Sequence, residues 1–109
     1  MAFLTGNPST QFASISTAAS GDTAVVAAVA GKRIKVVGFT IVNTTAQSIK
    51  FRSATTDLTG AMALGATAPL SVQGGNGVLF QTAAGAALNI NLSAATQVSG
   101  FVQYIVEAD

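Results

Sequence analysis

The chain of 109 residues contains no histidine, no cysteine and no tryptophan, and only 8% of its residues are charged. Without cysteine there is neither a disulfide nor a cysteine nucleophile, and without cysteine and histidine a zinc site of the usual ligand set is excluded. Histidine is also the commonest general acid and base and the base of the Ser-His-Asp triad, which is therefore ruled out. We predict a protein that is not an enzyme and that uses no metal, cofactor or small-molecule substrate.

The remaining catalytic patterns are also missing. No Ser-x-x-Lys sequence occurs, and the four acidic residues are scattered, with no Asp-x-Asp pair among Asp22, Asp57, Glu107 and Asp109. The glycine-rich segment 74–77 (GGNG) matches neither the dinucleotide-binding fingerprint nor the phosphate-binding loop. Because Asn-Gly is favoured where the backbone needs a positive φ, this segment predicts a hairpin turn.

Long hydrophobic runs are absent too, although half of the residues are hydrophobic and the mean hydropathy is +0.55. A membrane-spanning helix needs about 20 apolar residues. The best run here is the short segment Ala24–Ala30, which we read as a buried strand. The first residues carry neither a basic segment nor a sustained apolar one, so a secretory signal is not expected. A protein with so few charges is expected to bury its remaining apolar surface between subunits.

What is present predicts an all-β protein. Short runs rich in β-branched residues alternate with turn residues, and no stretch shows a sustained helical period. We predict a single β-sandwich, jelly-roll-like, of about eight short and mainly antiparallel strands over residues 12–109, preceded by an irregular arm over residues 1–11. The expected strands are 12–16, 23–30, 33–43, 47–53, 78–82, 87–92 and 98–107, with weaker candidates at 61–64 and 70–72.

The two clearest strands, 33–43 and 47–53, are separated by only three residues. We predict that they form a hairpin, with two apolar pairs on its buried face and one ion pair at its open end: Ile41 with Ile49, Phe39 with Phe51, and Arg33 with Asp57. Gly38, in the middle of the longer strand, indicates a bulge or a close backbone approach.

The basic residues form two small groups, and we interpret them first as solvated strand faces. The functional alternative is that the basic residues dock against an acidic partner surface and that the two apolar residues of the arm add to this contact. The candidate docking residues are Phe3, Leu4, Lys32, Arg33, Lys35, Lys50 and Arg52. A frayed terminus is the alternative for the arm. A net charge of +1 and 6% aromatic residues do not favour nucleic-acid binding.

The aromatic residues fall mostly at apolar strand positions, which favours a place in the core over an exposed glycan-binding site. They are Phe3, Phe12, Phe39, Phe51, Phe80, Phe101 and Tyr104.

Three stretches together carry a resemblance: Asp22–Lys35 (DTAVVAAVAGKRIK), Ser48–Leu64 (SIKFRSATTDLTGAMAL) and Ala87–Val106 (ALNINLSAATQVSGFVQYIV). With them the chain resembles the small virion proteins of tailed bacteriophages and prophages that decorate the capsid as cement proteins or form the base of a head fibre. The resemblance implies a β-sandwich without catalytic residues. It also implies a homotrimer that binds the major capsid protein on the capsid surface of the virion, after assembly in the host cytoplasm. A tail or fibre component with a receptor- or glycan-binding role remains the alternative.

Overall fold

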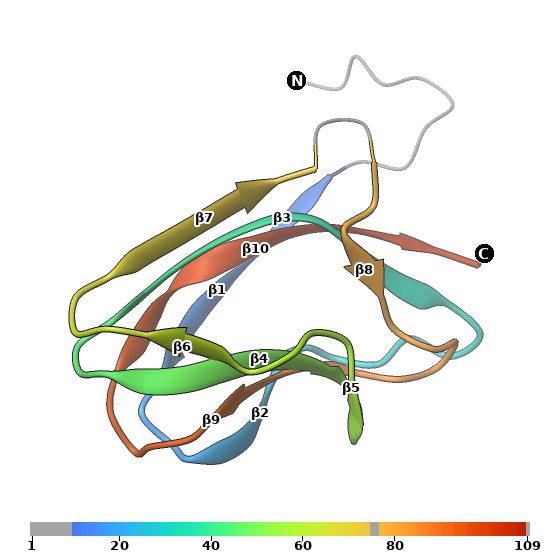
Figure 1. The fold of residues 1–109 in the computed structure, drawn as a ribbon. Helices are drawn as coiled ribbons and strands as arrows, with labels where there is room; N and C mark the ends of the chain where they lie inside the picture. The colour runs from blue at the N-terminus through green and yellow to red at the C-terminus, as the bar shows by residue number, and fades with distance from the viewer. Residues whose placement is uncertain (1–9, 75–76, 109) are drawn as a thin grey trace.

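The structure is a computed structural model that describes residues 10–74 and 77–108. This part of the chain contains ten strands and no helix, and the strands form two layers (Figure 1). The strands are β1 (Gln11–Thr17), β2 (Gly21–Val26), β3 (Arg33–Asn43), β4 (Gln47–Ser53), β5 (Thr56–Asp57), β6 (Met62–Leu64), β7 (Pro69–Gln73), β8 (Phe80–Gln81), β9 (Leu88–Leu92) and β10 (Val98–Glu107).

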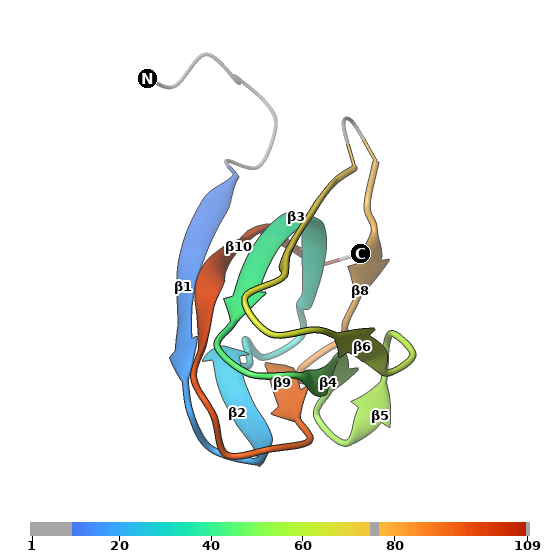
Figure 2. The ribbon, with the colours of Figure 1, turned by 60° about the vertical axis from the view of Figure 1, so that its left-hand side comes forward.

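The two layers are five-stranded antiparallel sheets, which we call sheet A and sheet B. Sheet A has the order β1-β10-β3-β7, with β8 also paired to β3, and sheet B has the order β2-β9-β4-β5, with β6 also paired to β4 (Figure 2). Strands β1 to β4 alternate between sheet A and sheet B. Strand β9 then pairs between β2 and β4 in sheet B, and β10 pairs between β1 and β3 in sheet A. This is the strand order of a jelly roll with eight positions, in which β5 with β6 and β7 with β8 each share one position. The predicted β-sandwich, including its jelly-roll character, is confirmed.

Most strand predictions hold, and three of them hold to the residue, at 33–43, 47–53 and 98–107. The predicted strand 23–30 is wrong in its second half, because β2 ends at Val26 and the segment 27–30 is exposed. Val26 pairs with Leu88, the first residue of β9, so the chain beyond it has no neighbouring strand to pair with. The predicted strand 78–82 is reduced to the two residues of β8.

The arm and the glycine-rich turn fall largely outside the described residues. Residues 1–9, with both apolar anchors of the arm, and residues 75–76 of the turn are not described. The first strand begins at Gln11, one residue earlier than the predicted start of the domain.

The predicted hairpin between 33–43 and 47–53 is wrong, because the two strands belong to different sheets. After β3 the chain crosses from sheet A to sheet B, and Asn43 fixes this crossing: its Nδ2 donates to the carbonyls of Thr45 at 2.7 Å and Leu64 at 3.3 Å. Both edges of β3 are occupied by β10 and by β7 with β8, and both edges of β4 by β9 and by β5 with β6. The two apolar faces still meet, but across the core instead of side by side.

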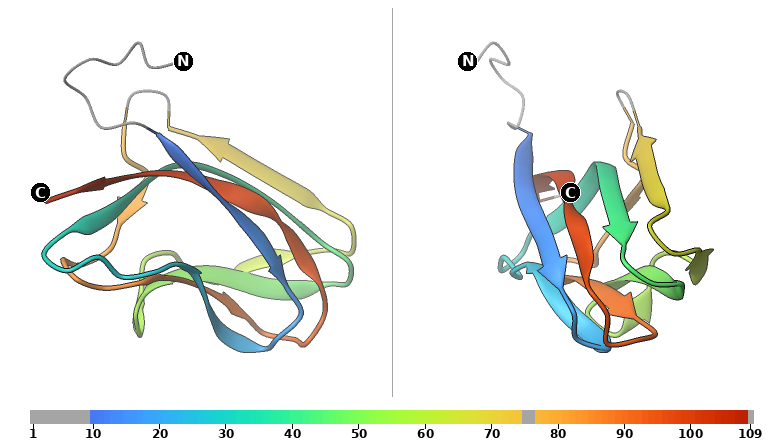
Figure 3. Two further views of the ribbon diagram at one scale, coloured as in Figure 1. Left: turned by 180° about the vertical axis from the view of Figure 1, so that it is seen from behind. Right: turned by 90° about the vertical axis from the view of Figure 1, so that its left-hand side faces the viewer.

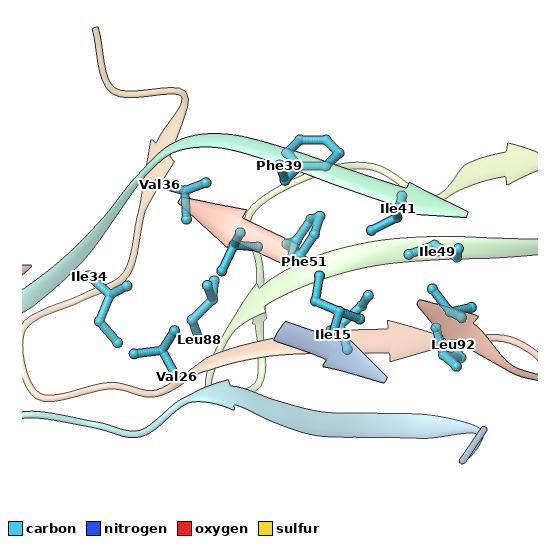
Figure 4. Packing of buried hydrophobic residues seen from close by; sticks show 13 residues of the cluster. Ile15, Val26, Ile34, Val36, Phe39, Ile41, Ile49, Phe51, Leu88 and Leu92 are labelled. Atoms are coloured by element: carbon cyan, nitrogen blue, oxygen red, sulfur yellow. The ribbon is translucent and has the colours of Figure 1, made fainter. Parts of the chain in front are cut away.

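The core between the sheets explains why these strands form. Inward-facing apolar residues of β3, β4, β9 and β10 pack against one another between the two sheets (Figure 4). In β4 and β9 they alternate with outward-facing polar residues, as a strand with one buried face requires. The rings of Phe39 and Phe51 lie 5.0 Å apart between the layers, and Phe80 packs 5.4 Å from Phe51. The buried hydrophobic residues are Ile15, Val26, Ile34, Val36, Phe39, Ile41, Ile49, Phe51, Leu88, Ile90, Leu92, Val98 and Val102.

Two glycines have a defined role in the backbone around β3, and Gly38 agrees with its prediction. Gly31, in the turn before β3, has a φ of +72°, and Lys32 donates its amide to the carbonyl of Val29 at 3.1 Å. In β3, Gly38 is opposite Gln103 while Val36 is opposite the next residue of β10, so the register shifts at this glycine. One extra residue in β3 therefore forms the expected bulge.

Candidate functional site

The outer face of sheet B carries a polar cluster that is neutralised within the subunit. Arg52 of β4 lies between two carboxylates, with Nε 2.9 Å from Asp57 and NH1 3.0 Å from Asp22. Lys50 places Nζ 3.2 Å from the carboxylate of Asp57, and Asn91 donates to Asp22 at 2.8 Å. Arg52 also donates to the carbonyl of Thr55. Two bases and two acids balance one another here, so this face presents little net charge.

Lys50 and Arg52 perturb the carboxyl group that they share. The hydrogen bond from Lys50, together with the positive charges of Lys50 and Arg52, lowers the pKa of Asp57 below its ordinary value. A lowered pKa in the folded state means that ionised Asp57 stabilises the fold above the unfolded-state pKa. That contribution is lost as the pH falls through the folded-state value.

We therefore expect Asp57→Asn to be less stable than the wild type at pH 7 and to approach it in strong acid. The difference is small because exposed ion pairs contribute little. Urea unfolding of both proteins at pH 7 and at about pH 2 measures it, since the unperturbed carboxyl titrates near pH 3.9. A stability difference that is the same at both pH values would show that the ion pairs do not stabilise the fold.

The outer face of sheet A is different, because its charges are confined to one end. The charged residues in the strands of this sheet are Arg33, Lys35 and Glu107. Lys35 Nζ lies 2.9 Å from Glu107 Oε1, and Arg33 donates NH1 to the carbonyl of Thr82 at 3.2 Å. Arg33 and Glu107 are directly opposite each other in the register of β3 and β10. The rest of the sheet has no charged side chain.

The uncharged part of this face carries exposed aromatic and aliphatic side chains. Phe12 of β1 is 63% exposed and packs against Phe101 of β10 in a tilted arrangement, with the ring centroids 5.9 Å apart. Val42 of β3 is 39% exposed on the same side of the sheet. Hydroxyl groups separate these residues, among them Thr40 and Ser71, whose oxygens are 2.9 Å apart. We call this surface, the outer face of β1, β10, β3 and β7 away from the charged end, the uncharged face.

The predicted docking residues are not brought together. Lys50 and Arg52 lie on the outer face of sheet B within the ion pairs described above, whereas Arg33 and Lys35 lie on β3 in sheet A. Lys32 is exposed in the turn before β3. The predicted pairing of Arg33 with Asp57 is wrong for the same reason, because these residues belong to different sheets. Phe3 and Leu4 lie outside the described residues.

The aromatic residues were only partly assigned correctly. Phe39, Phe51 and Phe80 pack into one cluster between the sheets, as predicted, but Phe12 is the most exposed large hydrophobic residue of the described chain. The segment around it, Gln11–Thr17, alternates Phe, Ser and Ser with Ala, Ile and Thr. Either set could face the core. In the structure, the pairing of β1 with β10 turns Ala13 and Ile15 toward the core. The sequence held no signal that could have shown the exposure of Phe12.

Among the described residues, no group of three or more acidic side chains is close enough to hold a metal ion. This part of the chain also includes no helical segment with the length and hydrophobicity of a transmembrane span.

The fold and this surface define a jelly-roll β-sandwich with one ion-paired outer face and one uncharged outer face. No model of a protein family, no curated protein and no solved structure matches the chain.

Proposed function

We propose that this protein is a structural protein of a tailed-bacteriophage virion, a capsid decoration protein that binds the outer capsid surface as a homotrimer and stabilises it. Its partner is the major capsid protein, and it acts by binding. The resemblance of three segments supports the phage assignment. A jelly-roll fold is found in viral capsid proteins, but it also hosts many other functions and does not by itself imply this one.

The observation that carries the binding role is the distribution of charge between the two outer faces. The bases and acids on sheet B pair within the subunit, while the uncharged face of sheet A presents Phe12, Phe101 and Val42. Interfaces have cores that are depleted of charge and enriched in aromatic residues. The uncharged face is therefore the surface that we expect to lie against the capsid.

The binding role is tested with capsids that lack the protein. Recombinant wild type, Phe12→Ala and the control Val29→Ala are titrated onto such particles, and occupancy is measured by quantitative gel analysis. Val29, in the loop between β2 and β3, is also exposed, at 38%, but lies off the uncharged face. Truncating an aromatic residue that is a hot spot of an interface costs about 2 kcal/mol or more, so Phe12→Ala should bind at least about tenfold more weakly. Val29→Ala should bind as the wild type does.

Two results would contradict the proposal. The first is equal occupancy by wild type and Phe12→Ala, which would place the contact elsewhere. The second is a protein that does not bind the particles, remains monomeric and shows saturable binding to a sugar; this would support the receptor-binding alternative. Exposed apolar surface and a mass in sedimentation that is a multiple of three chains are the expected properties of the free protein.

A further inference from the structure

The two sheets have four edges, and the edge formed by β1 is the least protected. In the described part of the chain β1 pairs with β10 alone, and its other side faces outward (Figure 3). The register with β10 is continuous over all seven residues, Gln11–Thr17, without a bulge. The strand contains no proline and no charged residue. A regular, uncharged edge of this kind is a template for pairing with another strand.

Each of the other edges carries a feature that hinders such pairing. On the far side of sheet A, β7 has five residues and begins with Pro69. On sheet B, β2 carries the charged Asp22 and an irregular register between Ala24 and Val26. The opposite edge of sheet B consists of β5 and β6, with two and three residues. Prolines, charges, bulges and short strands are the usual means by which proteins block edge pairing.

We propose that β1 pairs antiparallel with β1 of a second copy of this chain, about a two-fold axis, so that the two five-stranded sheets join into one sheet of ten strands. A strand edge without charge is self-complementary, because its amide and carbonyl groups match those of an identical antiparallel strand and no like charges meet. Ser14 is the middle residue of β1. The register with Ser14 opposite Ser14 therefore gives the longest overlap.

This register also matches the two faces of the sheet. It places Phe12 opposite Ser16 of the second copy, and Ala13 opposite Ile15, so outward residues meet outward ones and inward residues meet inward ones. Phe12, which is 63% exposed in the single chain, then gains cross-strand contact with the second copy. In a two-fold contact both copies use the same strand edge, so each β1 edge is occupied by one other copy and a third copy cannot add to it.

The pairing goes beyond the function proposed above and does not depend on it. It turns a monomer into a dimer, and a trimer whose three-fold axis crosses the two-fold axes at right angles into a hexamer.

The test is the mass of the particle in solution, measured by light scattering after size-exclusion chromatography, for the wild type and for Ser14→Lys. The Ser14 side chain is exposed on the outer face of β1, so the substitution leaves the core intact. Two opposed lysines repel each other across the two-fold axis. We expect the mass of the variant to be half that of the wild type. Ser14→Asp should behave in the same way, and an equimolar mixture of the two variants should restore the full mass.

Ser71→Lys is the matched control, because Ser71 is an exposed serine on the outer face of β7, the opposite edge strand of the same sheet. Its mass should equal that of the wild type. Equal masses for wild type and both Ser14 variants would overturn the proposal, and so would a wild type that grows into open-ended assemblies. If the Ser14 variants had the mass of one chain, instead of three, and the wild type had twice that mass, the result would support the strand pairing and contradict the trimer.

Discussion

Phe51→Ala is expected to lower the free energy of unfolding by about 3–5 kcal/mol, the usual cost of truncating a large buried aromatic residue. Phe51 is fully buried at the centre of the molecule, where its ring contacts Phe39 of the opposite sheet and Phe80 of β8. Its removal leaves a cavity between the layers that backbone relaxation fills only in part. Because domains of this size are stable by only about 5–15 kcal/mol, the loss is a large fraction of the total.

Urea unfolding followed by circular dichroism measures the effect. The matched control is Phe12→Ala, which removes the same ring from an exposed position, where a surface substitution usually changes stability by no more than about 0.5 kcal/mol. If both variants were equally stable, Phe51 would not occupy the core position that it has here.

Gly100→Ala is the second substitution with a large expected effect. Gly100 lies in β10 between Ile15 of β1 and Ile41 of β3, and its φ of +151° is a conformation that residues with a side chain rarely adopt. A Cβ atom at this position would be 1.9 Å from the carbonyl oxygen of Thr40, a distance at which the backbone of β3 must move.

We expect a loss of about 3 kcal/mol or more, because backbone strain of about 1–3 kcal/mol adds to the overpacking of a rigid neighbour. Thermal and urea unfolding would show it, with Gly60→Ala as the control. A Cβ at Gly60 meets no atom within 4 Å, and its φ is not in the positive region. That variant should be as stable as the wild type or slightly more stable, since alanine restricts the unfolded chain. Similar unfolding midpoints for the two glycine variants would contradict the close approach of β10 and β3.

The local pattern of the sequence determined most of the strands and, in some of them, which residues are buried. In β9 and in the middle of β4, from Ile49 to Arg52, alternation of apolar and polar residues left one possible inward face, and the structure uses it. The bounds predicted for β3, β4 and β10 agree with the structure to the residue. The all-β class followed from the same short period together with the lack of a helical one.

Only the tertiary structure decided which strands pair. The matched pattern of Phe39 and Ile41 with Phe51 and Ile49 predicted contact between two strands, and that contact exists. Two apolar faces can meet either as neighbours in one sheet or across the core of two sheets, and both arrangements bury the same side chains. The choice depends on which strands compete for each edge, and those strands lie far away in the sequence.

The candidate surface was decided in the same way. The sequence showed how few charges there are, but their concentration in ion pairs on sheet B and at one end of sheet A depends on strand order. Phe12 is exposed because β1 turns Ala13 and Ile15 toward the core, and either set of alternate residues in β1 was apolar enough to be buried. A one-residue change of register reverses the two faces of a strand, and for β1 the partner strand fixes the register through contacts that no local pattern specifies.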